Sequence, residues 1–80
     1  MGRRHEPQEA LGRAIRQLRD ERGLKQKDLA RAADMDVTAI SHIERGRSNP
    51  AWGTVRRIAT ALEVPVSEVA TRAERLASEG

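Results

Sequence analysis

The apolar residues recur at helical spacing in five separate stretches, and no stretch alternates as a β-strand does. The first stretch places Leu11, Ala14, Ile15 and Leu18 on one side of a helix. The five stretches predict helices at about residues 8–22, 26–33, 36–45, 51–62 and 67–76. Because the connections are only a few residues long, we expect a compact all-α domain of five helices.

Residues with strong backbone preferences mark the ends of these helices. Pro7 suits a first helical turn, and Gly23 and Gly46 suit the position just after a helix. Asp36 is the predicted N-cap of the third helix. We expect a flexible arm over residues 1–7, the folded domain over 8–77 and a frayed end over 78–80.

The positive charge lies in the first part of the chain. The net charge is +3, and residues 1–50 hold 11 Lys and Arg against 8 Asp and Glu. A basic half fits a polyanionic partner, although a solvated surface of mixed charge gives the same count. Cysteine is absent and Trp52 is the one aromatic residue. We therefore expect no disulfide, metal site or cofactor, and no aromatic platform for single strands.

Membrane and enzyme functions find no support in the pattern. No apolar run approaches the roughly 20 residues of a membrane span, and residues 1–7 lack the apolar stretch of a signal peptide. We expect a cytoplasmic protein without a membrane partner. The acids Asp20, Glu21 and Asp28 have no histidine or nucleophile set beside them, so we predict no enzymatic activity and no catalytic residues.

Two short helices joined by a tight turn at residues 34–35 predict a helix-turn-helix. At about 100° per residue, the third helix separates an apolar side from a row of small polar and medium-sized side chains. That row contains Val37, Thr38, Ser41, His42 and Arg45. Thr and Ser can hydrogen-bond base edges, Val can contact a thymine methyl group and His can donate to guanine. An ordinary solvent-exposed helix face is the alternative interpretation.

Four segments in this order resemble the lambda-repressor-like, XRE/Cro-type helix-turn-helix DNA-binding family. They are residues 26–30, 40–46, 47–50 and 58–64, and the resemblance extends over about residues 11–69. It implies a lambda-repressor-like fold and a transcriptional regulator, such as a repressor. Such a regulator would bind a pseudo-palindromic operator in double-stranded DNA as a homodimer.

The resemblance also implies roles for individual residues. The base-reading positions correspond to Val37, Thr38, Ser41 and His42. The phosphate-contacting positions correspond to Gln26, Arg45, Arg47 and Ser48. A structural ion pair corresponds to Arg19 and Glu44. The candidate dimer interface, on the last helix and the approach to it, contains Val66, Val69, Ala73 and Leu76, with packing inside one chain as its alternative.

Three positions depart from the family pattern. Asp34 stands in the turn where glycine is usual, but Asp tolerates a left-handed backbone. Asp36 replaces the common Ser or Thr cap; it repels phosphate but can accept from a cytosine amino group. Ala51 replaces the usual Ser cap of the fourth helix, and Gly53 further weakens that start. We expect the neighbouring Trp52 to pack in the core.

Two other functions are open to the same fold. One is a protein-interaction adaptor that binds DNA weakly and without sequence preference. The other is the antitoxin component of a toxin–antitoxin pair. The sequence does not identify the protein partner that either function requires.

Overall fold

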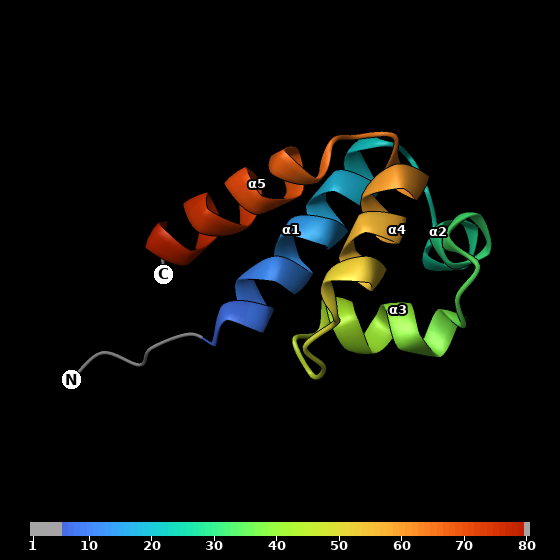
Figure 1. Cartoon of the computed structure of the whole chain (residues 1–80), viewed down its shortest axis with the longest axis horizontal. Coiled ribbons are helices and arrows are strands. Elements are labelled where there is room, and N and C mark those ends of the chain that lie inside the picture. Colours follow the sequence, from blue (N-terminus) through green and yellow to red (C-terminus); the bar gives the residue numbers. More distant parts are fainter. Residues whose placement is uncertain (1–5, 80) are drawn as a thin grey trace.

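The computed structural model describes residues 6–79, all of which lie in helices or their connections (Figure 1). The elements are α1 (Pro7–Glu21), α2 (Gln26–Ala33), α3 (Val37–Glu44), α4 (Trp52–Leu62) and α5 (Val66–Glu79). The predicted all-α, five-helix class is therefore confirmed. Of the end predicted to fray, residues 78 and 79 belong to α5 and residue 80 lies outside the described residues. The arm predicted over residues 1–7 lies mostly outside the described residues, and Pro7 already belongs to α1.

A single apolar core joins all five helices. α5 runs beside α1, α2 packs against α3, and α4 packs against α2 (Figure 1). Each helix contributes at least one large side chain that solvent does not reach. These side chains are Ile15, Leu29, Ile40, Ile58, Leu62 and Val69. The core therefore lies on the inner side of α3 and leaves its other side exposed.

Two helices end on a left-handed residue that is not glycine, and an arginine from another part of the chain binds each end. Asp34 ends α2 with φ 57°, and Glu63 ends α4 with φ 62°. Arg57 Nη2 donates to the carbonyl oxygens of Ala33 (2.8 Å) and Asp34 (2.6 Å). Arg22 Nε donates to the carbonyl oxygen of Leu62 at 2.6 Å, and its Nη2 donates to that of Glu63 at 3.0 Å. These bonds satisfy carbonyl groups that a helix end leaves unpaired.

The structure corrects the expectation for Trp52. Its side chain is 63% exposed rather than buried in the core. Trp52 is the first residue of α4, and the buried side of that helix begins one turn later, at Val55. The indole therefore lies beyond the edge of the packed layer. As expected, Ala51 is an N-cap without a side-chain hydrogen bond.

Gly12 allows α1 to approach the end of α3. A Cβ atom at this position would overlap the carbonyl oxygen of Ile43 and lie 2.9 Å from that of Glu44. Both obstacles are backbone atoms, which cannot move aside as a flexible side chain can. The periodicity of apolar residues does not reveal this contact, because glycine has no side chain to count.

Alanine scanning of two helical glycines tests this close approach. We expect Gly12→Ala to lower the free energy of unfolding by about 1–3 kcal/mol through overpacking. Gly53→Ala is the matched control, because its Cβ would meet nothing within 4 Å. It should raise stability by up to about 1 kcal/mol through helix propensity. Equal shifts of the two thermal melting curves would contradict the assigned contact.

A second test concerns the ion pair between α1 and α5. Arg72 Nη1 donates to Glu21 Oε2 at 2.7 Å, and this hydrogen bond holds the pKa of Glu21 below its ordinary value. A lowered folded-state pKa stabilises the protein above the unfolded-state pKa, and this contribution is lost as pH falls through the folded-state pKa.

We therefore expect Glu21→Gln to lower the melting temperature at neutral pH and to have little effect once the carboxylate is protonated in both states. Added salt should reduce the difference, because the Glu21 carboxylate is exposed to solvent. Glu74→Gln is the control, since Glu74 forms no ion pair with the described residues. A Glu21→Gln deficit that is the same at pH 7 and at pH 2 would rule out this linkage.

Candidate nucleic-acid interface

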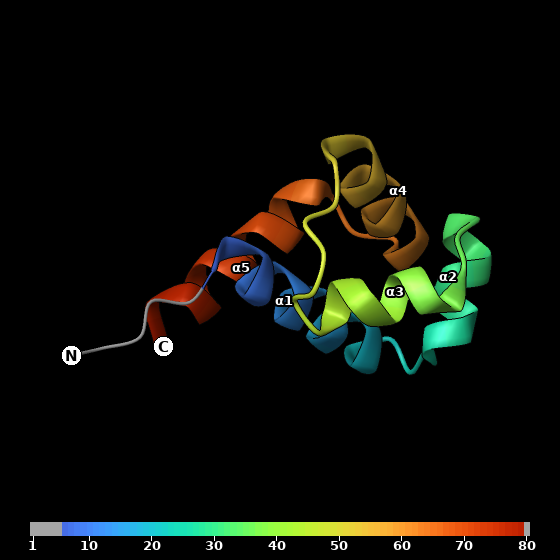
Figure 2. The same cartoon turned by 90° about the horizontal axis from the view of Figure 1, so that it is seen from below.

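α2 and α3 form a helix-turn-helix around the left-handed residue Asp34. The backbone N–H of Met35 donates to the carbonyl oxygen of Ala30 at 2.8 Å and closes the end of α2. α3 begins two residues later, with Ile40 and Ile43 buried on its inner side. The predicted tolerance of Asp34 for this backbone conformation is confirmed by its φ of 57°. The turn thus directs α3 across one surface of the molecule, which Figure 2 views directly.

The outer side of α3 carries the row predicted from its periodicity. Val37 is 45% exposed, Thr38 and His42 are exposed, and Ser41 is half-buried. The structure therefore brings these four side chains to one surface. None of them forms a side-chain hydrogen bond or ion pair with the described residues. A helix with a narrow face of free polar and small apolar groups has the shape and chemistry to enter a major groove.

A buried carboxylate holds the end of α3 in place. Glu44 is 6% exposed and accepts hydrogen bonds from Arg19 Nε (2.7 Å) and Nη2 (2.9 Å). The structure thus forms the ion pair between the two predicted residues. The Glu44 hydrogen bond is the main reason why the pKa of Arg19 is raised above its ordinary value. Arg19 Nη1 also donates to the carbonyl oxygen of Leu24 at 2.8 Å, which fixes the approach to α2.

The same carboxylate also holds the start of α2. Gln26 Nε2 donates to Glu44 Oε1 at 3.0 Å, so one amide proton of Gln26 is committed to the protein. Gln26 is the first residue of α2, where backbone N–H groups lack helical partners and favour an anion. The Asp28 carboxylate satisfies one backbone donor near the start of α2, because it accepts from the N–H of Lys25 at 2.9 Å.

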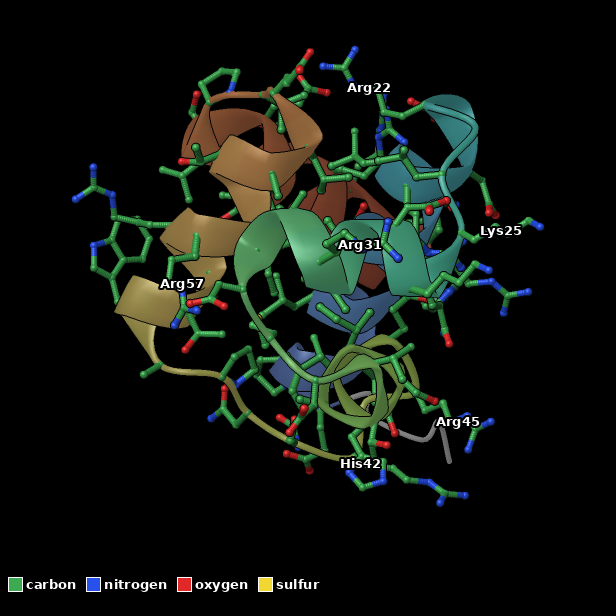
Figure 3. The ribbon with its side chains drawn as sticks, turned by 90° about the vertical axis from the view of Figure 1, so that its right-hand side faces the viewer. Arg22, Lys25, Arg31, His42, Arg45 and Arg57 are labelled. Carbon is green, nitrogen blue, oxygen red and sulfur yellow. The ribbon has the colours of Figure 1, made fainter. Side chains whose placement is uncertain are left out.

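Exposed cations lie beside α3. Arg45 and Arg47, predicted from the resemblance, are exposed, and Ser48 is half-buried. Figure 3 shows His42 and Arg45 extending from the same end of the molecule, away from the protein. Lys25 extends to the same flank of the molecule as Arg45, higher in this view. The residues predicted to contact phosphate did not include Lys25 and Lys27. Both are exposed and flank Gln26, and their charge at this position was the signal that could have added them.

The predicted dimer residues are only partly available. Val69 is 1% exposed and Leu76 is 5% exposed, because α5 packs along α1. This packing inside one chain corrects the expectation that both residues face a second copy. Val66 and Ala73 remain half-buried.

Comparisons with known proteins agree on the domain. A family model described as the helix-turn-helix domain matches residues 10–71. The HTH-type transcriptional regulator DdrOP3 of Deinococcus deserti is 42% identical over 55 residues, which are 69% of this chain and 43% of that protein. The ImmF control region 10 kDa protein of Bacillus phage phi105 is 34% identical over 70 residues, which are 88% of this chain and 78% of that protein.

A solved structure shows the same arrangement of helices. It is the restriction-modification controller protein C.Esp1396I, crystallised as a tetramer with its natural 35 base-pair operator. Its TM-score is 0.85 at 27% identity, over 92% of this chain and 97% of that chain. This chain spans less than half the length of DdrOP3 and of several other curated relatives. Within residues 6–79, no helix is long and apolar enough to cross a membrane.

Replacing the buried carboxylate tests its structural role. We expect Glu44→Gln to lower the free energy of unfolding by roughly 3 kcal/mol, because it leaves the Arg19 guanidinium without its charged partner. Glu63→Gln is the matched control, since Glu63 meets Arg22 at 3.5 Å on the exposed surface. It should change stability by less than about 1 kcal/mol. An unchanged melting curve for Glu44→Gln would refute the assignment.

Proposed function

Because this chain belongs to the helix-turn-helix domain family, we propose that it is a transcriptional regulator that binds a specific sequence in double-stranded DNA. The outer row on α3 carries this proposal, because it brings four side chains to one surface: Val37, Thr38, Ser41 and His42. The core packs against the inner side of α3, and the bonds of Glu44 hold its last residue. In the proposed complex, α3 enters the major groove and these residues contact base edges. The protein acts by binding alone, in the cytoplasm where its target DNA lies.

The groups around α3 suit contacts with the DNA backbone. Gln26 lies at an anion-favouring helix start and keeps a second amide proton available beyond its bond to Glu44. Arg45 and Arg47 are exposed cations at the other end of α3, with Ser48 beside them. We assign these four residues to phosphate contacts, which set the position of the protein on DNA without reading its sequence.

We propose that two copies bind together on an inverted repeat. One reading helix contacts only a few base pairs and discriminates poorly by itself. Two such helices would occupy half-sites whose centres lie about 34–36 Å apart. The crystallised C.Esp1396I tetramer on its operator supports an oligomer on DNA. Of the predicted dimer residues, Val66 and Ala73 keep surface for such a contact.

Selection of bound duplexes from a random library, at near-physiological salt, tests the proposal. We expect enrichment of an inverted repeat with half-sites one helical turn apart. Loss of all binding as salt rises, with no enriched sequence, would leave only backbone attraction. That result would favour the protein-interaction adaptor or a partner-dependent antitoxin instead.

Two alanine variants separate base reading from phosphate binding. We expect Thr38→Ala to cost about 1–3 kcal/mol on the selected operator and to relax specificity. Arg47→Ala should weaken binding to operator and random duplexes alike. It should also reduce the slope of log affinity against log salt concentration by about one, as the loss of one phosphate contact predicts. Fluorescence anisotropy at several salt concentrations measures both effects. Identical behaviour of the two variants on both duplexes would show that the roles are assigned wrongly.

A further inference from the structure

Trp52 is a large apolar side chain that the fold leaves in water. It is 63% exposed, and among the described residues Val37, in the outer row of α3, is the only other exposed large hydrophobic residue. The next residue is Gly53, where an added Cβ would meet nothing within 4 Å, so no other segment covers this position. Tryptophan and arginine are among the residue types that most often carry the binding energy of a protein interface.

A hollow of about 470 Å³ opens between the end of α2 and the first turns of α4. It is lined by residues 32–34 of the α2 end and, on α4, by Gly53, Arg56, Arg57 and Thr60. Trp52 directly precedes this set and lies four residues before Arg56, so the two side chains project from the same side of α4. Trp52 and the hollow together are called the α4 surface below.

The α4 surface is positively charged. Arg56 and Arg57 are exposed, and Asp34 is the one acid among the residues that line the hollow. Arg56 forms no hydrogen bond or ion pair with the described residues. Arg57 Nη2 donates to the carbonyl oxygens of Ala33 and Asp34, which holds the guanidinium at the hollow. Guanidinium groups in such a position favour a carboxylate, which accepts charge-assisted hydrogen bonds from them.

We propose that the α4 surface docks an acidic segment of another protein. Its carboxylates would meet Arg56 and Arg57, and an apolar side chain of the segment would pack against Trp52. A second copy of this chain fits less well, because a two-fold contact would bring the same arginines together. DNA also fits less well, because Figure 3 shows Arg57 on the opposite flank from Lys25 and Arg45. A regulator bound through α3 would thus keep the α4 surface for a protein partner.

The chain has one tryptophan and no tyrosine, so its fluorescence reports on the α4 surface directly. Displayed random peptides that lack tryptophan are selected on the immobilised full chain. An excess of soluble Trp52→Ala chain removes peptides that bind elsewhere. We expect the enriched peptides to combine acidic residues with an aliphatic or aromatic residue. A synthetic copy of one should shift the Trp52 emission to shorter wavelength, because the indole leaves water.

Variants separate the apolar contact from the charged one, with the anisotropy of the labelled peptide as readout. Trp52→Ala should weaken binding about thirtyfold, as the loss of a hot-spot side chain does. Arg56→Ala should weaken it about fivefold, as the loss of one exposed ion pair does. Arg56→Glu should instead prefer a peptide in which one acid is replaced by lysine. Arg75→Ala, an exposed arginine on α5, is the matched control and should change nothing.

Three outcomes would overturn the inference. One is a selection that enriches no peptides, or only peptides without acidic residues. Another is a loss of operator affinity in both Trp52→Ala and Arg56→Ala, which would assign the α4 surface to DNA. The third is a smaller mass of Trp52→Ala in light scattering, which would assign it to contact between copies. Because peptide binding is measured without DNA, failure of the duplex selection would overturn the proposed function and leave this inference standing.

Discussion

The buried carboxylate of Glu44 is the interaction on which the arrangement of the first three helices depends. A carboxylate removed from water destabilises a protein unless its oxygens are paired and hydrogen-bonded. Here the partners come from two other helices, Arg19 in α1 and Gln26 in α2. These bonds restrain the end of α3 relative to both helices, and Gly12 lets α1 approach the same end. α3 is therefore held from its inner side and its last residue, which leaves the outer row free.

Arginine has two different uses in this small domain. Arg19, Arg22, Arg57 and Arg72 join separate helices through carboxylates or backbone carbonyl oxygens. With a core this thin, such bonds replace part of the packing that a larger domain would have. The positive charge of the chain thus overstates the charge available to a polyanion. The cations that remain exposed near α3 include Lys25, Arg45 and Arg47. Figure 3 shows Lys25 and Arg45 on the same flank of the molecule.

Helical periodicity and turn residues predicted most of the fold, since they are local properties. Residues such as Ile40 and Ile43 alternate with Thr38 and Ser41 at helical spacing, so both sides of α3 could be assigned before its neighbours were known. The left-handed end at Glu63 was not predicted, because glutamate is not among the residues that favour this backbone conformation. The bond from Arg22 Nη2 to its carbonyl oxygen joins positions 41 residues apart, which local patterns do not reveal. Trp52 was misplaced for a related reason: its apolar character indicates burial, but α4 starts beyond the edge of the core. Whether Val69 and Leu76 face α1 or a second copy is likewise decided by tertiary packing.

The central claim is that the outer row of α3, together with the start of α2, forms the surface that lies on DNA. Amide chemical-shift mapping of the ¹⁵N-labelled chain, titrated with a selected operator duplex, tests it most directly. The largest changes should fall within residues 25–27 and 36–48, with α1 and the middle of α4 little affected. Changes centred on α5, or a uniform small shift that disappears with added salt, would contradict the claim.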